Sequence, residues 1–291
     1  MTRPTTMTSL SIILPAKNEG ASLATLLPEL RQRFPEAEIV VVDDGSEDDT
    51  ASVCQRFPVR LVRHPYSMGN GAAVKAGARH ASGATLVFMD ADGQHDPADV
   101  QRLLDRLGEG YGMVVGARDY DSQAGHHRAL ANSLYNRLAS WMVGHRIDDL
   151  TSGFRAVAAD KFRRYLHLLP NGFSYPTTIT MSFFRAGLPV AYVPIKARRR
   201  EGKSHIRLLR DGMRFLLIIV RIGTLYSPFR LFLPVSLTFF LAGFAHYVHT
   251  YLTEGRFTNM SALMFTTAIL TFLIGIVSEQ ITALHYKDSE K

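Results

Sequence analysis

The stretch Phe88-Met89-Asp90-Ala91-Asp92-Gly93-Gln94-His95-Asp96-Pro97 decides which fold we expect for this chain. The apolar run at 84–89 predicts a buried strand that ends in two carboxylates, one residue apart. Asp96 followed by Pro97 is typical of the start of a helix. Carboxylates at the carboxyl end of a buried strand lie where open α/β sheets bind ligands, and their oxygens suit Mg²⁺ or Mn²⁺. Taken alone, Asp-x-Asp is equally typical of an acidic turn that caps a helix.

The composition divides the chain. Its 291 residues, 46% of them hydrophobic, can form one large or two smaller compact units. Residues up to about Pro194 are typical of a soluble α/β domain, whereas residues 231–284 are almost free of charge. The net charge of +7 indicates an anionic partner: nucleic acid, a membrane surface or a phosphorylated substrate. The single cysteine, Cys54, excludes an internal disulfide and fits a reducing cytoplasm, and the polar residues 1–9 lack the apolar core of a signal peptide.

Strand-like and helix-like segments alternate along the first half of the chain. Apolar runs at 10–15, 38–44 and 60–63 precede the strand at 84–89, with a helix of ten to fifteen residues expected between most of them. This order predicts an α/β fold with a mainly parallel, doubly wound sheet. Three strands then end in acids, at Glu19, Asp43-Asp44 and Asp90 to Asp92, on one edge of the sheet. Crowded carboxylates are costly unless a cation or a donor-rich ligand lies among them, which favours a binding site over a plain acidic rim.

Gly69-Asn70-Gly71 superficially suggests dinucleotide binding. It has no third glycine at the required spacing and follows the third predicted strand instead of the first, and the chain has no P-loop. Glycines here either let the backbone approach a base or sugar, or allow a helix to pack closely on the sheet. Both interpretations stay open at this point.

Three motifs together resemble glycosyltransferase family 2, which has the GT-A fold. They are Leu14-Pro15 with Asn18-Glu19, the run 42–46 with Thr50, and Asp90-Ala91-Asp92 with Gln94. The loop at 149–155, Asp-Leu-Thr-Ser-Gly-Phe-Arg, resembles the acceptor-side loop of the dolichol- and polyprenyl-phosphate sugar synthases. The resemblance covers roughly residues 9–206 and, through the apolar tail, points to the bacterial branch with two transmembrane helices.

The resemblance implies a nucleotide-sugar donor. By motif position, the nucleoside pocket would be lined by Pro15, Lys17, Glu19, Val42 and Asp44. The donor would also contact Asp90, Ala91 and Asp92, while Asp90, Asp92 and Gln94 would hold Mg²⁺ or Mn²⁺ and, through it, the diphosphate.

The basic run at 198–204 resembles a diphosphate-binding loop of the family, with Arg199 at the diphosphate position. His205 stands where a common form of that loop has a lysine, and Lys203 is the residue that could replace its charge. A basic patch facing the membrane is the alternative interpretation, and both can hold at once.

On the acceptor side, Asp149 and Arg118 are expected as catalytic residues. The resemblance places the acceptor phosphate against Arg118, Arg128, Asn132 and Ser152. A surface ion pair for Arg118 and a solvated helix position for Arg128 are the alternatives. A polyprenyl monophosphate has a second pKa of about 6 and is largely dianionic at neutral pH, so it needs no strong base. Asp149 is therefore expected to orient a substrate, and the resemblance implies inversion at the anomeric carbon.

The C-terminal third predicts a membrane attachment. In 206–226, four arginines spaced 3, 4 and 7 apart share one helical face, which predicts an interfacial amphipathic helix or a helix packed on the globular domain. Segments 231–252 and 260–284 are each long enough to span a bilayer. Basic residues precede 231, whereas the connector has only Arg256, so both termini and the catalytic domain are expected in the cytoplasm. The expected divisions are 1–205, 206–230 and 231–291.

Other functions share parts of this pattern. A processive polysaccharide synthase would need a Gln-x-x-Arg-Trp signature, and the only tryptophan, Trp141, lies in Ala-Ser-Trp-Met-Val. A transferase to a lipid hydroxyl, a nucleotidyltransferase and a catalytically silent membrane scaffold stay open. We do not expect a nucleic-acid partner, because it would not explain two apolar spans. The sugar, the base and any homo-oligomer formed through the membrane helices are not determined by the sequence.

Overall fold

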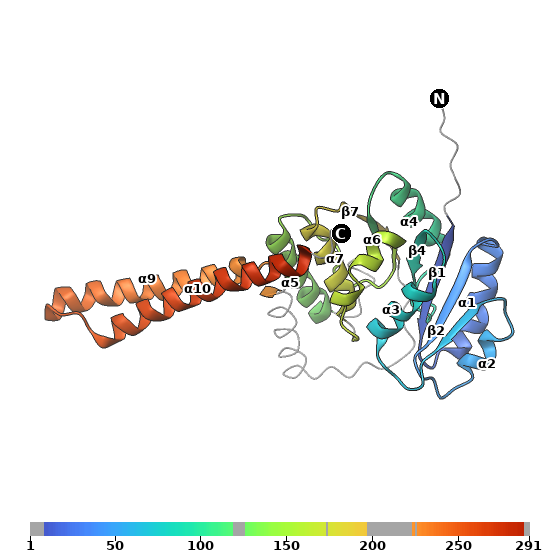
Figure 1. Cartoon of the computed structure of the whole chain (residues 1–291), viewed down its shortest axis with the longest axis horizontal. Helices are drawn as coiled ribbons and strands as arrows, with labels where there is room; N and C mark the ends of the chain where they lie inside the picture. The colour runs from blue at the N-terminus through green and yellow to red at the C-terminus, as the bar shows by residue number, and fades with distance from the viewer. Residues whose placement is uncertain (1–8, 119–125, 173, 197–222, 225, 288–291) are drawn as a thin grey trace, which may run out of the picture. The chain divides into compact units, whose positions relative to one another are not determined.

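The computed structural model describes residues 9–118, 126–172, 174–196, 223–224 and 226–287 (Figure 1). The chain forms two compact units, residues 1–205 and 206–291, which are taken separately below.

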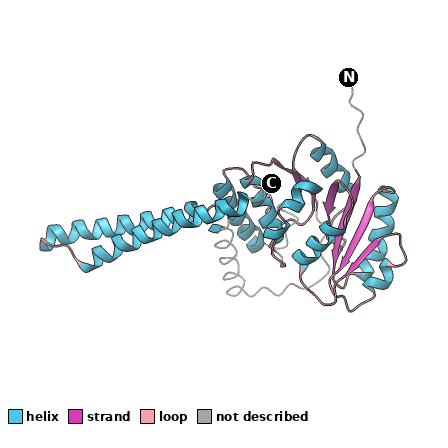
Figure 2. Ribbon diagram, in the orientation of Figure 1, coloured by secondary structure: helices cyan, strands magenta, loops and turns pink. Residues whose placement is uncertain are grey.

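The first unit is built on one seven-stranded sheet with the order β3-β2-β1-β4-β6-β5-β7 (Figure 2). The strands are β1 (Leu10–Ala16), β2 (Glu38–Asp43), β3 (Arg60–Arg63), β4 (Thr85–Phe88), β5 (Met113–Arg118), β6 (Arg155–Ala158) and β7 (Val190–Ile195). Strand β6 is antiparallel to both of its neighbours, and the other pairings are parallel. The predicted mainly parallel α/β sheet is confirmed, and the reversed strand β6 is an addition to it.

Helices connect these strands. They are α1 (Gly20–Arg33), α2 (Thr50–Cys54), α3 (Asn70–His80), α4 (Ala98–Gly108), α5 (His126–Val143), α6 (Ala159–Arg164) and α7 (Tyr175–Arg185). The helix predicted to start at Asp96-Pro97 is α4, which begins at Ala98. Asp96 Oδ1 accepts a hydrogen bond from the Ala98 N–H at 2.8 Å, so Asp96 does satisfy one of the unpaired donors at this helix start.

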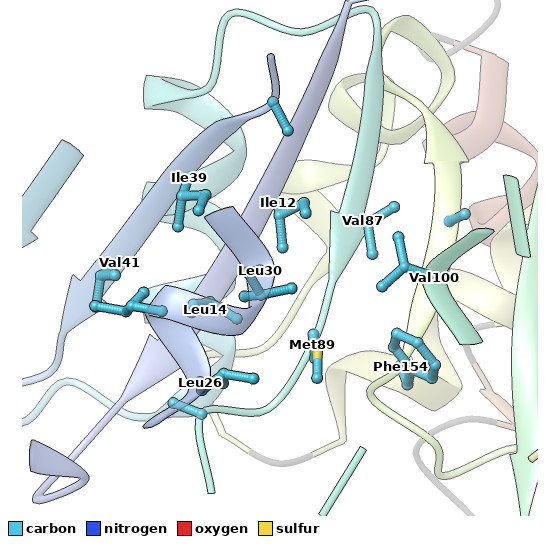
Figure 3. Close-up of a cluster of buried hydrophobic side chains, with 14 of the residues drawn as sticks. Ile12, Leu14, Leu26, Leu30, Ile39, Val41, Val87, Met89, Val100 and Phe154 are labelled. Atoms are coloured by element: carbon cyan, nitrogen blue, oxygen red, sulfur yellow. The ribbon is translucent and has the colours of Figure 1, made fainter. Parts of the chain in front are cut away.

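Apolar side chains cover both faces of the sheet. On one face Ile12 and Leu14 of β1 pack with Leu30 of α1 and Val100 of α4 (Figure 3). On the other face α3 lies so close that a Cβ on Gly77 would be 2.3 Å from the Ile13 side chain. This double covering, which is that of a doubly wound sheet, leaves the carboxyl ends of β1, β2 and β4 as a firmly supported edge.

The second unit is a helical hairpin of α9 (Pro228–Glu254) and α10 (Asn259–Lys287). The helices approach closely, since a Cβ on Gly243 would lie 2.9 Å from Met264 Cβ. Both are long and apolar enough to cross a membrane, and most of their residues are exposed. Helix α9 starts three residues before the predicted span, with Pro228 at its first position, where a proline disrupts nothing.

One acid in this hairpin has a clear structural role. Glu279 of α10 accepts a hydrogen bond from the Phe229 N–H, in the first turn of α9, at 3.3 Å. A carboxylate there satisfies an N–H that the helix itself leaves unpaired and complements the positive end of the helix dipole. The predicted amphipathic helix falls mainly in 206–222, outside the described residues.

Candidate active site

A cavity of about 500 Å³ opens at the carboxyl edge of β2, β1 and β4, which are neighbours in the sheet. It brings together eight of the residues predicted for donor and metal binding: Pro15, Lys17, Glu19, Asp44, Asp90, Ala91, Asp92 and Gln94. The rest of the lining includes Gly69 and Asn70 of the glycine-rich run, Thr151 and Gly153 of the 149–155 loop, and Ser67, Tyr175 and Pro176, which the sequence did not predict. The acidic strand ends therefore share one concave site.

The two loops that carry the family motifs are hydrogen-bonded to each other. Asn18 has a positive φ of 57°, its N–H donates to Ser46 Oγ at 2.9 Å, and its Oδ1 accepts from the Glu47 N–H at 2.9 Å. The Glu19 N–H donates to Thr50 Oγ1 at 3.0 Å. Asn18, Ser46 and Thr50 thus fix the ends of β1 and β2 beside the cavity, and Asn tolerates the left-handed conformation better than most residues.

The turn after β4 offers oxygen ligands to the cavity. Gly93 has a φ of 72°, and the Gln94 N–H donates to Asp92 Oδ1 at 3.1 Å, which closes the turn. The described residues contain no group of three His, Cys, Asp or Glu side chains suited to a metal. Two carboxylates and one amide oxygen form a sparse set, which fits Mg²⁺ or Mn²⁺ because such ions take further ligands from phosphate and water.

Asp90 is partly exposed to this cavity, with 39% of its side chain accessible. Its Oδ2 lies 3.5 Å from His95 Nε2. Burial raises the pKa of the Asp90 carboxyl, but the hydrogen bond from His95 and the charges of Arg118 and Arg155 outweigh it and hold that pKa below its ordinary value. Asp90 is therefore ionised at neutral pH, as a metal ligand must be.

Asp44 is surrounded by donors from its own chain. It accepts hydrogen bonds from His64 Nδ1 at 2.7 Å, Ser67 Oγ at 2.9 Å, and the N–H groups of Met68 at 2.8 Å and Gly69 at 2.9 Å. Burial raises the pKa of the Asp44 carboxyl, but these hydrogen bonds outweigh burial and hold that pKa below its ordinary value. The carboxylate therefore anchors the 64–69 loop at this end of the cavity.

Gly69 and Gly71 allow a close approach of two loops. Gly69 has a φ of 101°, and a Cβ there would lie 2.5 Å from the Asn171 carbonyl oxygen. A Cβ on Gly71 would lie 2.1 Å from the Pro170 carbonyl oxygen, and the Ala72 N–H donates to the Asn171 oxygen at 3.1 Å. The close packing of these two glycines is thus against the 170–172 loop and not against the sheet, and Gly69 also lines the cavity.

Arg118 and Asp149 form a paired unit next to the cavity. Arg118 Nε donates to Asp149 Oδ2 at 2.8 Å and Nη2 donates to Oδ1 at 3.1 Å, while Nη2 also reaches Thr151 Oγ1 at 2.6 Å. The N–H groups of Thr151 and Ser152 donate to Asp149 Oδ1 at 3.0 and 3.1 Å. Arg118 is 29% exposed and Asp149 only 3% exposed, so this is a partly buried ion pair and not a pair on the open surface.

This pairing determines the charge of Asp149. Burial raises the pKa of its carboxyl, but the hydrogen bonds and charge of Arg118 lower that pKa more, and backbone N–H groups add to the effect. A carboxylate with a lowered pKa and this many donors is a poor proton acceptor. The geometry therefore suits Asp149 to positioning Arg118 and its own loop.

The 149–155 loop meets the 90–94 turn at Gly153. A Cβ at this position would lie 3.2 Å from both oxygens of Asp90 and 3.1 Å from Tyr175 Oη. Thr151, Gly153 and Tyr175 all line the cavity, whereas Asp149 and Ser152 are buried behind the lining. The two halves of the site are thus in direct contact.

We expect Gly153→Ala to weaken divalent-ion binding by about tenfold, because the added methyl would crowd both Asp90 oxygens. Gly153 does not have a positive φ, so the fold should tolerate alanine. The measurement is Mn²⁺ affinity by titration of the purified chain, with Gly108→Ala as the control, because a Cβ there meets nothing within 4 Å. Unchanged affinity in Gly153→Ala would show that the space beside Asp90 is not used by the ion.

Several predicted residues are not placed in the cavity. Val42 is buried in β2, and its side chain faces Gly77 of α3. Ser152 is buried, and its Oγ has no hydrogen-bond partner within the described ranges. Arg128 and Asn132 lie in α5, but their side chains are outside the described set, as are Arg199 and Lys203 altogether.

Comparison with known proteins agrees with this geometry. Residues 11–166 match Glycosyl transferase family 2, and residues 227–284 match the GtrB C-terminal hairpin. Glycosyltransferase AglJ of Haloferax volcanii is 26% identical over 96% of both chains. Undecaprenyl-phosphate mannosyltransferase of Micrococcus luteus is 32% identical over 65% of this chain and 83% of that protein.

A solved structure shares the fold. Glucosyl-3-phosphoglycerate synthase from Mycobacterium tuberculosis, in complex with Mn²⁺, UDP and glucosyl-3-phosphoglycerate, superposes with a TM-score of 0.60 at 22% identity, covering 76% of this chain and 86% of that one. The family match, the GT-A-like sheet and the apolar hairpin agree on one assignment. The chain is a membrane protein and a glycosyltransferase, and it belongs to glycosyltransferase family 2 with a C-terminal hairpin of the GtrB type.

Proposed function

We propose that the protein is an inverting, metal-dependent glycosyltransferase that moves a hexose from a UDP- or GDP-linked donor to a polyprenyl phosphate. The observation that carries the proposal is the contact between the Asp90 to Gln94 turn and the 149–155 loop in one cavity, on a chain with a membrane hairpin. Relatives named as polyprenyl-phosphate sugar transferases support the acceptor class. The neighbouring complex with UDP and Mn²⁺ supports the donor class and the metal.

In this proposal the donor lies along the cavity from Lys17 to Gln94. The nucleoside contacts Pro15, Lys17, Glu19 and the loop that Asp44 anchors, with Val42 supporting Pro15 through the β1–β2 pairing. Asp90, Asp92 and Gln94 hold Mg²⁺ or Mn²⁺, which when bound would offset the negative charge that grows on the leaving diphosphate. Arg199 and Lys203 are proposed to contact the same diphosphate.

The acceptor approaches from the side of the 149–155 loop. We assign its phosphate to Arg118, Arg128, Asn132 and Ser152, with Asp149 holding Arg118 in place. An oxygen of the acceptor phosphate forms the new bond to the anomeric carbon as the bond to the nucleoside diphosphate breaks. This single displacement inverts the anomeric centre and needs no proton removal from a dianionic phosphate. A lipid hydroxyl would need a base, a role to which Asp149 is poorly suited because its pKa is lowered.

The pH dependence should follow the acceptor and not the protein carboxylates. The pKa values of Asp90 and Asp149 both lie below the ordinary range, so both groups stay ionised above pH 5. The acceptor phosphate gains a proton below about pH 6 and becomes a weaker nucleophile. We expect kcat/KM for the acceptor, measured from pH 5 to 8.5, to fall tenfold per pH unit below that value. A flat profile down to pH 5 would argue against a phosphate acceptor.

The proposed location is the cytoplasmic side of the inner membrane. The basic run before the first span and the single cation in the connector, Arg256, support a cytoplasmic catalytic domain and cytoplasmic termini by the positive-inside rule. Residues 206–230 are proposed as the juxtamembrane segment between the catalytic domain at 1–205 and the hairpin at 231–291. The exposed apolar faces of the hairpin contact lipid and are the surface for any homo-oligomer.

The direct test offers the purified full-length chain one radiolabelled nucleotide sugar at a time, with polyprenyl phosphate and Mg²⁺ or Mn²⁺. Label should enter the organic phase for one hexose donor and only when a divalent ion is present. Transfer that continues unchanged in EDTA would exclude the metal-dependent mechanism. Absence of transfer from any UDP- or GDP-linked hexose would exclude the proposed donor class.

A further inference from the structure

The imidazole of His95 contacts both the 90–94 turn and the acceptor-side loop. His95 directly follows Gln94 in the chain, and its side chain is only 6% exposed. Nε2 lies 3.5 Å from Asp90 Oδ2, and the ring stacks on Phe154, with centroids 4.8 Å apart and planes inclined by 20°. Phe154 follows Gly153, whose backbone faces the same Asp90 carboxylate. One side chain thus links the predicted metal ligand to the acceptor-side loop.

The polar atoms of this ring show which contact matters. Nδ1 is buried and has no hydrogen-bond partner in the part of the chain that the structure describes. Burying an imidazole with an unpaired nitrogen is unfavourable, and hydrophobic packing alone would be served better by an apolar ring. The compensating polar contact is the one from Nε2 to Asp90. This arrangement indicates that the His95 ring acts on the Asp90 carboxylate and does not only fill space.

A carboxylate on a turn can rotate about its terminal bond, and a metal ligand must present its oxygen in one direction. A donor held at Oδ2 fixes that rotation and therefore fixes where Oδ1 presents its lone pairs. The stacking on Phe154 in turn prevents the imidazole from rotating away. Residues that orient metal ligands in this way commonly change metal affinity by 10- to 100-fold when replaced.

We propose that His95 is a positioning residue that orients Asp90 for the divalent ion and couples this orientation to the acceptor-side loop through Phe154. The proposal rests on the metal role assigned to Asp90 and Asp92 under the proposed function. It adds a function to a residue that is not part of the cavity lining.

Two substitutions separate the polar contact with Asp90 from the stacking. His95→Phe keeps an aromatic ring on Phe154 and removes the donor to Asp90, whereas His95→Gln keeps an N–H donor and removes the stacked ring. The control is His145→Phe, because His145 also stacks on a phenylalanine, Phe184, at 5.5 Å but is exposed and outside the cavity lining.

The measurement is Mn²⁺ affinity of the purified full-length chain, followed by the electron paramagnetic resonance signal of free Mn²⁺, with UDP and separately with GDP present. We expect His95→Phe to weaken binding about 10- to 100-fold and His95→Gln by no more than about threefold. His145→Phe should match the wild type. Thermal unfolding midpoints of all variants are recorded so that a loss of folded protein is recognised.

The outcomes separate this inference from the proposed function. If Asp92→Ala loses Mn²⁺ binding while His95→Phe retains wild-type affinity, the role of His95 is wrong and the metal site stands. If Asp92→Ala also binds Mn²⁺ normally, the metal assignment fails and the role of His95 fails with it. If His95→Phe does not fold, His95→Gln decides: affinity close to the wild type supports the role of the polar contact with Asp90, and a loss of tenfold or more overturns it.

Discussion

Asp92→Ala is expected to lower sugar transfer by at least about a hundredfold while the protein stays folded. Asp92 lies on the turn after β4, lines the cavity with Asp90 and Gln94, and helps to close that turn through the Gln94 N–H. Because the turn offers only two carboxylates and one amide oxygen to the ion, the loss of one carboxylate should greatly weaken the affinity for the divalent ion. Charge on the leaving diphosphate then goes unstabilised, and such stabilisation contributes several kcal/mol to related reactions.

The measurement is initial transfer rate over a Mn²⁺ titration, which distinguishes weak metal binding from a damaged fold. Asp105→Ala is a suitable control, because Asp105 is an acid on the exposed face of α4 whose contact is the Gln101 amide at 2.7 Å. Near-normal turnover by Asp92→Ala at low Mn²⁺ would remove the metal from this turn. Partial recovery at high Mn²⁺ would support the assignment.

Asp149→Asn should leave donor binding intact and reduce transfer by at least about a hundredfold. Asparagine has nearly the same shape, but it carries no charge and cannot accept both guanidinium hydrogen bonds that Asp149 now accepts from Arg118. Breaking this partly buried ion pair costs less than the roughly 3–5 kcal/mol of a fully buried one, because Arg118 is 29% exposed and can turn toward water, so Arg118 is expected to reorient. The acceptor phosphate then loses its proposed partner, while the nucleoside end near Lys17 is unaffected.

The neighbouring acid provides a matched control. Asp148 pairs with Arg146 at 2.7 Å, but that arginine is 89% exposed, so Asp148→Asn should cost little. Nucleoside diphosphate affinity with Mn²⁺ and single-turnover transfer are measured for both variants. A loss of affinity in Asp149→Asn would move this residue to the donor site. Undiminished transfer would exclude any role for the Arg118 pair.

The order of apolar and polar residues within single segments was sufficient to predict which edge of the sheet forms the site. The strands β1, β2 and β4 each have a buried apolar run followed by polar residues, so their ends could be placed without knowledge of distant contacts. In a parallel sheet such ends meet at one edge, which is why Glu19, Asp44 and Asp90 were expected together. The structure has all three in the lining of one cavity.

Contacts between distant segments could not be predicted in the same way. Tyr175 reaches the cavity from a segment with no signature of its own, and the composition of β6 does not reveal its direction. Gly153 lies in the recognised 149–155 loop, but its approach to Asp90 could not be predicted from that loop alone. Position 71 has no room for a side chain, because the carbonyl oxygen of Pro170, about a hundred residues later in the chain, lies against it. His95 lies in the 88–97 segment that predicted the fold. Its proposed role depends on Phe154, which is distant in sequence and lies beside His95 only in the folded chain.

The location of Asp44 in the cavity was predicted correctly, but its hydrogen-bond partners were not. The sequence suggested a carboxylate that accepts hydrogen bonds from a nucleoside, whereas the structure has its oxygens engaged by His64, Ser67 and two backbone N–H groups. These donors come from the loop after β3, which is too irregular to be anticipated from spacing.

The measurement that tests the central claim most directly compares two acceptors of equal chain length, a polyprenyl phosphate and the corresponding polyprenol, with the donor identified by the labelling screen. The account predicts a lipid product that contains one sugar and one phosphate, equimolar release of nucleoside diphosphate, and no transfer to the alcohol. Transfer to the polyprenol at a comparable rate, or release of diphosphate in place of nucleoside diphosphate, would contradict it.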